Sequence, residues 1–352
     1  QNLLDMIDLY EKDLPKLKKH IKGFPSPDAL RAICKQGRQG AAPFKGYTTA
    51  TEGSDWIIKC ARKESTRPLW ILVWGGLDDL AQALHDAPDI QNKIRVYWIG
   101  GPNKKWSTNS YVYIVENFPN LWFIEANASY RGFITNDKQP GKFNKDYYDE
   151  CIRGAGHLGK DYIKYYDGKV KMGDTPSLLY MMDGDPNNPQ KESWGGSFEK
   201  FTHSPRVIFN RSTTLKDTVP VYAIIEFRIK GPEMNIPADS TCFTMTTDGQ
   251  DWDGFYLGNG EYAVRYAPKS TAVLTYKITS DIPGFPEQTG EFVVNNTWPG
   301  KIDADDYKLG DYWYTDRNDA NLFEGKWQGS KTVSKWRKDV LQDWAKRWEL
   351  LK

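Results

Sequence analysis

The stretch from Leu72 to Leu84, LVWGGLDDLAQAL, joins an apolar strand to an amphipathic helix through two glycines. Glycine lets the backbone approach a ligand closely, and the first turn of a helix offers unpaired N–H groups. The chain contains neither G-x-G-x-x-G nor G-K-[ST] at this point, so a dinucleotide or P-loop site is not indicated. The local pattern predicts a strand-to-helix corner, and a ligand-facing site only if other polar residues converge on it.

Further carboxylates and amides stand next to apolar segments. Glu125 and Asn127 end the run NLWFIEAN, and Asp174 precedes Thr-Pro at the start of PSLLYMM. Asp174 can cap that helix, and Glu125 and Asn127 can be ordinary loop residues. Asp78 and Asp79 fall in the first turn of a helix, where carboxylates interact favourably with the helix dipole whatever the function. Each residue therefore has a structural explanation beside a functional one.

Three apolar runs would position these residues. RPLWILVWGG, KIRVYWIGG and NLWFIEAN are continuous rather than alternating, which predicts strands buried on both faces. The helical patterns LDDLAQALHDA and NSYVYIVENF lie between them, and this alternation predicts a mostly parallel sheet with crossover helices, an α/β fold. Ligands of such sheets bind at the carboxyl ends of the strands, and residues 73–76 lie at such an end.

Amphipathic patterns predict helices towards both ends of the chain. Apolar residues recur at three and four positions from Asn2 to His20, with a break or kink at Pro15. The segment DALRAICKQG predicts a short helix closed by Gly37. Near the C-terminus one predicted helix face carries Val333, Trp336, Val340, Leu341, Trp344 and Trp348.

The pattern of apolar and polar residues changes between Val219 and Val294. Short alternating runs such as YAIIEFRIKG, GEYAVRYAP and AVLTYKITS are separated by turn clusters, which predicts an antiparallel β-sandwich. Because segments with an α/β pattern lie on both sides of this module, we expect it to be an insertion into the α/β domain. The predicted domains are an α/β domain at 1–215, the β-sandwich at 216–296, and a C-terminal segment at 297–352 that packs back on the α/β domain.

Composition narrows the class of partner. Over 352 residues, 47 Lys and Arg against 46 Asp and Glu give no basic field for nucleic acid, and no apolar run reaches the roughly 20 residues of a membrane span. Four scattered cysteines indicate neither a zinc site nor a disulfide scaffold. The 14 Trp and 20 Tyr suit either sugar faces or core packing. Small molecules or neutral polymers are the expected partners.

The chain opens with QNLLDMIDLY, inside a helical pattern and without an initiator methionine. This start indicates a processed or truncated product. The sequence does not begin with a signal peptide, but because its start is that of a processed product, secretion stays an open alternative. The sequence does not indicate an oligomeric state.

Several ordered motifs carry a resemblance to known families. ILVWGGLDDLAQAL and VYWIGG resemble strand ends of nucleoside hydrolases. YEKDLPKLKKHIKGFPSPDALR, EGSDWI, RPLWILVWGG, GDTPSLLY, SWGGSF and WRKDVLQDWAKRW are together similar to the nucleoside hydrolase-like domain of a bacterial family of cellulose-binding proteins. This resemblance covers most of residues 1–205 and 298–352 and implies the nucleoside hydrolase-like form of the α/β fold.

The inserted part resembles a second family. EFRIKGP and DWDGFYLGNGEYAVRYAPKSTAVLTYKITSDIPGFPEQTGEFVV are similar to the immunoglobulin-like domain that precedes the catalytic barrel in some bacterial glycoside hydrolases. The resemblance implies an immunoglobulin-like fold and a carbohydrate context, with no catalysis in that module.

The first resemblance implies hydrolysis of N-glycosyl or related glycosyl bonds. In nucleoside hydrolases Ca²⁺ binds the sugar diol and activates water, and the match implies the Val73 carbonyl and Asp174 as its ligands. Glu125 and Asn127 match a pair that holds the sugar. Two departures count against catalysis: an Asp-rich N-terminal metal loop has no counterpart here, and Gly173 replaces a histidine that would act as general acid. No catalytic residue is therefore assigned.

The alternative is a non-catalytic protein that binds cellulose-like polysaccharide. Rings in SWGGSF, DGQDWDGFY and NNTWPG, among them Trp194 and Trp252, can stack on sugars. The expected partner is then a polysaccharide rather than a sugar or nucleoside-like small molecule. A third alternative is an interaction scaffold whose β module docks a partner enzyme. The family context implies a periplasmic or extracellular bacterial protein.

Overall fold

The computed structural model describes residues 2–134 and 146–352. They form two compact units, each assembled from separate segments of the chain. The first draws on Gln1–Gln36, Ser129–Ser197 and Asp319–Lys352, and the second on Gly37–Ala128 and Phe198–Asn318. These units reflect compactness, whereas the domain boundaries expected from the sequence reflect the inserted module, so those boundaries stay predictions.

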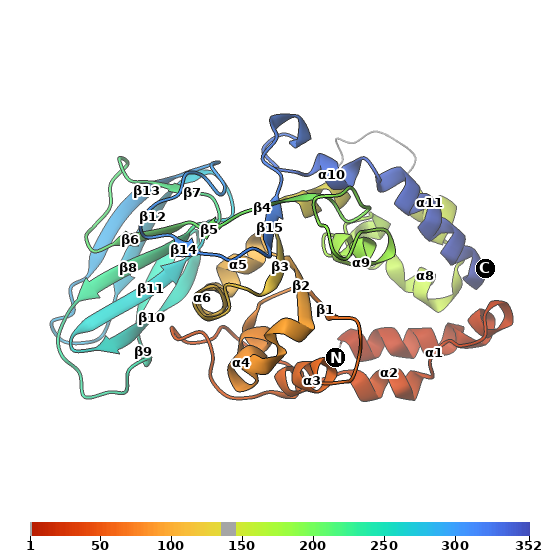
Figure 1. Ribbon diagram of the computed structural model, residues 1–352, viewed down its shortest axis with the longest axis horizontal. Helices are drawn as coiled ribbons and strands as arrows, with labels where there is room; N and C mark the ends of the chain where they lie inside the picture. The colour runs from red at the N-terminus through yellow and green to blue at the C-terminus, as the bar shows by residue number, and fades with distance from the viewer. Residues whose placement is uncertain (1, 135–145) are drawn as a thin grey trace. The chain divides into compact units, whose positions relative to one another are not determined.

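A five-stranded sheet organises the second unit (Figure 1). Its order is β1 (Leu69–Val73), β2 (Ile94–Ile99), β3 (Trp122–Ala126), β15 (Trp313–Asp316) and β4 (Phe198–Lys200). The first four strands are parallel, and β4 runs antiparallel to β15. The accompanying helices are α3 (Glu52–Ala61), α4 (Asp78–Asp86), η1 (Pro88–Lys93), α5 (Pro102–Trp106) and α6 (Thr108–Asn117). The predicted mostly parallel sheet with crossover helices is confirmed.

Strand β1 departs from the prediction of full burial. All five of its residues are partly exposed, whereas nearly every residue of β2 and β3 is buried. The reason is its position at the end of the sheet, where it pairs with β2 alone among the named strands. A continuous apolar run does not distinguish an end strand from a central one.

The β module is a mostly antiparallel eight-stranded sheet in the order β6-β8-β11-β10-β9-β12-β13-β7. Its strands are β6 (Arg206–Phe209), β7 (Thr218–Pro220), β8 (Ile224–Lys230), β9 (Thr241–Thr247), β10 (Gln250–Gly258), β11 (Glu261–Tyr266), β12 (Ala272–Thr279) and β13 (Gln288–Asn295). A further pair, β5 (His203–Ser204) with β14 (Tyr307–Lys308), connects the module to β4 and β15. The module is thus inserted between two adjacent strands of the α/β sheet.

The eight-stranded sheet folds over on itself. The ring of Phe227 on β8 lies 4.6 Å from that of Tyr276 on β12, although three strands separate β8 from β12 in the sheet order. Phe292 on β13 joins the same cluster at 6.2 Å from Phe227. The inward-facing side chains of β8, β12 and β13 therefore form one core, as expected for the predicted β-sandwich.

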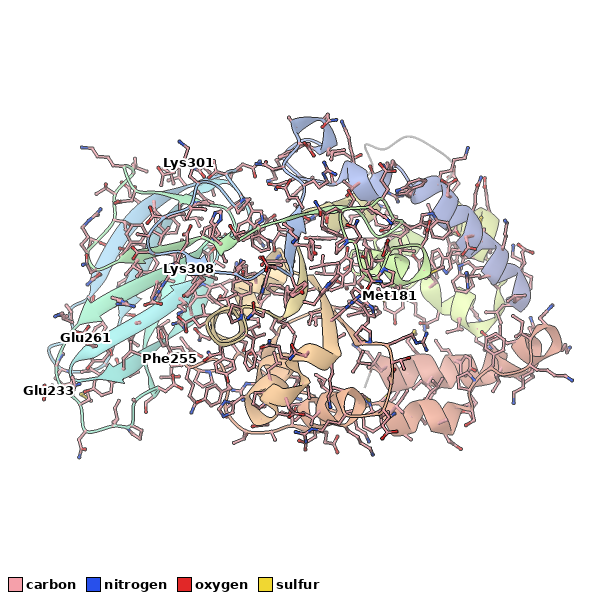
Figure 2. The ribbon with its side chains drawn as sticks, viewed as in Figure 1. Met181, Glu233, Phe255, Glu261, Lys301 and Lys308 are labelled. Carbon is pink, nitrogen blue, oxygen red and sulfur yellow. The ribbon has the colours of Figure 1, made fainter. Side chains whose placement is uncertain are left out.

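A long loop of the α/β part reaches the β module. The ring of Phe44 lies 6.2 Å from that of Phe255 on β10 and 3.6 Å from the guanidinium carbon of Arg265 on β11. Figure 2 labels Phe255 on the side of the module that faces the α/β elements and Glu261 near its outer edge. This loop and the β module are therefore in direct contact within the second unit.

The first unit is mainly helical. It contains α1 (Asn2–His20), α2 (Pro27–Ile33), η2 (Ser129–Phe133), η3 (Tyr148–Ile152), α8 (Gly156–Tyr162), η4 (Tyr166–Gly168), α9 (Thr175–Met182), η5 (Ala320–Leu322), α10 (Lys331–Ser334), α11 (Arg337–Trp348) and η6 (Glu349–Leu351). Helix α1 continues through Pro15, and α2 ends at Ile33 rather than reaching Gly37. The residues of the predicted C-terminal helix face pack into the core of this unit, but they are divided between α10 and α11 rather than carried by one continuous helix. No helix in the described residues is long and apolar enough to cross a membrane.

Candidate functional site

The carboxyl ends of the four parallel strands share one edge of the sheet. Gly100 and Gly101 follow β2 there, and Asn127 follows β3. A Cβ atom on Gly100 would lie 2.3 Å from Oδ1 of Asn127, so only glycine fits beside this amide. Gly101 has φ +45°, a conformation that glycine adopts most readily. Glycines at this edge thus make room for a polar group from the neighbouring strand.

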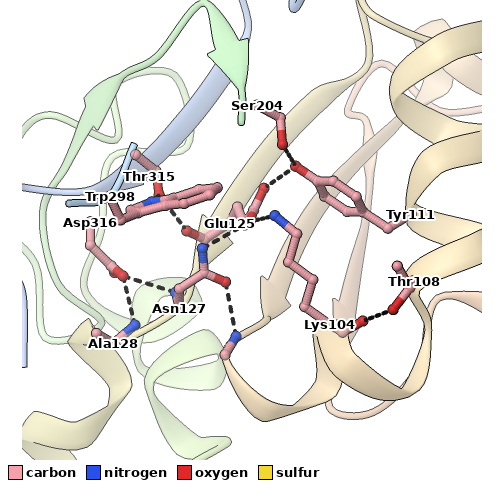
Figure 3. Close-up of polar contacts among 11 residues, drawn as sticks. Lys104, Thr108, Tyr111, Glu125, Asn127, Ala128, Ser204, Trp298, Thr315 and Asp316 are labelled. Atoms are coloured by element: carbon pink, nitrogen blue, oxygen red, sulfur yellow. Dashed lines mark hydrogen bonds and ion pairs between the residues drawn. The ribbon is translucent and has the colours of Figure 1, made fainter. Parts of the chain in front are cut away.

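Glu125 lies at the centre of a buried hydrogen-bonded network (Figure 3). Its Oε1 accepts from Lys104 Nζ at 2.8 Å and from Asn127 Nδ2 at 2.8 Å. Its Oε2 accepts from the hydroxyl of Tyr111 at 2.7 Å, and that hydroxyl lies 2.8 Å from Ser204 Oγ. All five side chains are excluded from solvent. The carboxylate is therefore fully engaged by protein groups.

Asn127 and Asp316 fix the loop that follows β3. Oδ1 of Asn127 accepts from the backbone N–H of Gly101 at 2.9 Å. Oδ2 of Asp316, at the end of β15, accepts from the N–H groups of Asn127 and Ala128 at 2.9 and 2.6 Å. Three neighbouring strand ends are thus held together by side-chain to backbone bonds.

Burial dominates the electrostatics of this network. Desolvation lowers the pKa of Lys104, and the charge of Glu125 opposes that shift. The ammonium also lies 3.9 Å from the ring centroid of Tyr111 and 4.4 Å from that of Trp298, where it is attracted to the aromatic faces. Desolvation raises the pKa of Tyr111 well above its ordinary value, so the phenol stays a neutral donor. The arrangement resembles a structural anchor more than a reactive group awaiting substrate.

The two carboxylates after the glycine turn hold the loop at 37–51. Asp78 accepts from the N–H of Ala42 at 2.8 Å, and burial raises its pKa. Asp79 accepts from the N–H of Arg38 at 3.0 Å and from Thr51 Oγ1 at 2.6 Å. Both lie in the first turn of α4, as predicted, and both have structural partners.

Of the predicted site residues, Glu125 and Asn127 are brought together, and Val73 ends β1 in the same unit. Asp174 and Trp194 belong to the first unit. The assignment of these five residues to sugar or metal binding stays a prediction.

Asp174 occupies the N-cap position of α9, but its side chain makes no capping hydrogen bond. Within the described residues its carboxylate has no hydrogen-bond partner, and desolvation raises its pKa. A partly buried carboxylate without a partner is unusual, because desolvation is normally offset by donors. Asp174 is therefore the carboxylate of the predicted set that is open to a ligand.

Trp194 packs, partly buried, against the core of the first unit, and its backbone N–H donates to the carbonyl of Asp183 at 3.1 Å. The next residue, Gly195, passes so close to α9 that a Cβ would lie 2.3 Å from the carbonyl oxygen of Pro176. The segment is held firmly against the helix that follows Asp174.

Sequence reasoning missed Lys104, Tyr111 and Asp316. Lysine side chains usually face solvent, yet Lys104 and Lys105 are both buried. Their carboxylate partners lie 21 and 143 residues away, so no local signal identifies them. Among the described residues, no group of three or more His, Cys, Asp or Glu side chains is placed to hold a metal ion.

Comparison with known proteins identifies the family. The model of the nucleoside hydrolase-like domain of cellulose-binding Sde182 matches residues 1–198, and the model of a domain of unknown function matches residues 218–281. The second match does not test the immunoglobulin-like resemblance of the β module. No curated protein gives a significant match.

Two solved structures are similar to parts of the chain. A nucleoside hydrolase-related protein from Saccharophagus degradans, described as associated with carbohydrate metabolism, is 19% identical over 83% of this chain and 87% of its own, with a TM-score of 0.44. A glycoside hydrolase candidate from Bacteroides vulgatus is 24% identical over 23% of this chain and 16% of its own, with a TM-score of 0.21. Since the family model covers more than half of the residues, the chain belongs to the cellulose-binding Sde182 family with its nucleoside hydrolase-like domain.

Proposed function

We propose that the protein binds carbohydrate polymers and does not use Glu125 for chemistry. The observation that carries the proposal is the engagement of both Glu125 oxygens by Lys104, Asn127 and Tyr111 in a site without solvent access. A group that acts on a sugar must come within hydrogen-bond reach of it. In this protein the network at the sheet edge would then serve as a rigid support, and exposed aromatic side chains would bind the polymer.

The cellulose-binding family supports a neutral polysaccharide as the ligand class. The near balance of 47 basic and 46 acidic residues agrees with a neutral polymer rather than a polyanion. A periplasmic or extracellular location, where such polymers are met, belongs to the same proposal.

Sedimentation with amorphous cellulose tests the proposal. We expect the wild-type chain to sediment with the polymer and to be released by soluble gluco-oligosaccharide. A chain that stays wholly in the supernatant would remove cellulose-like polymer as the ligand. The variant Trp194→Ala tests the residue singled out by sequence: weaker retention supports a role for its ring, and unchanged retention excludes it.

Glycosyl hydrolysis is the second candidate, and the unpartnered carboxylate of Asp174 favours it. Calcium takes six to eight oxygen ligands, of which the Asp174 carboxylate would supply at most two. Asp174 alone therefore does not make a complete calcium site. When bound, calcium would supply Lewis-acid activation of a sugar diol or water.

Calorimetric titration of CaCl₂ into the protein tests this candidate. Burial raises the pKa of Asp174, so protonation competes with the metal at a higher pH than for an ordinary aspartate. We expect calcium affinity to fall as the pH drops, beginning above the usual aspartate range near pH 4, and to vanish in Asp174→Asn. Binding that survives in this variant, or no binding by the wild type, would remove Asp174 as a calcium ligand.

A further inference from the structure

Two tryptophans from distant parts of the second unit lie together at its surface. Trp106 ends α5, just beyond the carboxyl end of β2, and Trp252 lies on β10 of the inserted module. Their ring centroids are 5.2 Å apart, and the ring planes are inclined by 34°. Trp106 is 47% exposed, and Trp252 is partly exposed. We call these two residues the indole pair.

A buried lysine supports the indole pair from within. Lys105 Nζ lies 5.3 Å from the ring centroid of Trp106 and 5.2 Å from that of Trp252. The same ammonium forms an ion pair with Asp248 at 2.7 Å, and the lysine side chain is 1% exposed. Tyr266 packs edge-on against Trp252 at 5.3 Å. The two rings are therefore held in place before any ligand arrives, which reduces the entropy cost of binding.

Two polar atoms beside the pair have no partner. Trp252 Nε1 and Gln250 Oε1 are buried and make no hydrogen bond within the described residues. Gln250 and Trp252 are two residues apart on β10, so their side chains leave the same face of the strand. One is a donor and the other an acceptor. Buried polar groups without a hydrogen bond are uncommon, so this part of β10 has unused hydrogen-bonding capacity beside Trp252.

We propose that the indole pair is a stacking site for a neutral polysaccharide. A pyranose ring presents apolar C–H faces, which stack on indole rings. It also presents hydroxyl groups at its rim, which form hydrogen bonds with polar atoms of the protein. This inference rests on the proposed carbohydrate binding and gives it a location.

Affinity electrophoresis in gels containing hydroxyethylcellulose tests the site with a soluble single-chain probe. We expect Trp106→Ala and Trp252→Ala each to weaken retardation about tenfold or more, since tryptophans that a ligand covers commonly dominate binding. Trp106→Phe, which keeps an aromatic face, is expected to retain most of the affinity. The matched control is Trp56→Ala, which removes a partly exposed tryptophan of α3 in the same unit and is expected to bind like the wild type.

The outcomes separate the site from the function. Retardation of the wild type with unchanged retardation of both alanine variants overturns the indole pair and leaves carbohydrate binding in place. A wild type that is not retarded and does not sediment with cellulose overturns both.

Discussion

Replacing Lys104 with alanine is expected to lower the free energy of unfolding by about 3–5 kcal/mol, because the substitution leaves Glu125 as an uncompensated charge in a site closed to water. The loss of cation contacts with Tyr111 and Trp298 adds to the cost. Urea denaturation followed by tryptophan fluorescence measures the effect.

Two variants make the Lys104 result interpretable. Lys301→Ala removes an exposed lysine, labelled in Figure 2, and is expected to change stability by less than about 0.5 kcal/mol. The double variant Lys104→Met with Glu125→Leu removes both charges and is expected to recover much of the lost stability. A Lys104→Ala protein as stable as the Lys301→Ala protein would mean that the network is not the anchor described.

Replacing Glu226 with glutamine is expected to lower the free energy of unfolding by a similar amount, about 3–5 kcal/mol at neutral pH. Glu226 on β8 is buried and pairs with Arg206 at 3.2 Å, Arg228 at 2.6 Å and Arg265 at 2.9 Å. Arg265 is itself buried, with a side-chain exposure of 7%. Without the carboxylate, this guanidinium loses its counter-ion in a poorly hydrated site.

The Glu226 effect has a defined pH dependence. Desolvation raises the pKa of this carboxyl, but the charges of Arg265 and Arg206 outweigh it, and the net pKa is lowered. The folded-state pKa then lies below the unfolded value, so the stabilisation is present above the ordinary glutamate pKa and is lost as the pH falls through the folded-state value. The stability gap between wild type and Glu226→Gln should therefore shrink in acid.

Glu261→Gln is the matched control for Glu226. Glu261, at the start of β11, pairs with Lys230, at the end of β8, at 3.5 Å, and both side chains are exposed. Exposed ion pairs contribute about 0–1 kcal/mol, so this variant should unfold close to the wild type. Equal effects of the two substitutions, or a Glu226 effect that does not change with pH, would contradict the assignment of the buried arginine cluster.

Much of the α/β architecture could be predicted because it depends on local pattern. The runs that became β1, β2 and β3 are apolar and separated by amphipathic helices, and parallel strands place their carboxyl ends together. From this pattern Glu125 and Asn127 are predicted to lie at the edge of the sheet where the carboxyl ends of the parallel strands meet. The pattern does not reveal that Lys104 donates a hydrogen bond to Glu125 in a buried site. A lysine is expected to face solvent unless its distant partner is known.

The β module shows the same division between local and distant information. Alternation in the sequence identified β8, β11 and β12. Burial alternates along β12, whereas residues 224–227 of β8 and 262–264 of β11 are buried in succession, so both faces of those two strands are covered. The outer strands β6 and β7 hold only four and three residues and pair in parallel, so their alternation is too short to read and their partners are not neighbours in sequence. The contact between Trp106 and Trp252 depends on how the β module packs in the second unit, so it could not be predicted from the sequence either.

Calorimetric titration of cellohexaose into the wild-type chain, with calcium present, tests the central claim of carbohydrate binding without cleavage most directly. We predict saturable heats that return to the baseline after each injection, as for a ligand that binds and stays intact. A sustained heat flow after each injection would show turnover and contradict the claim in favour of hydrolysis. An absence of any binding heat, together with no sedimentation on cellulose, would contradict carbohydrate binding itself.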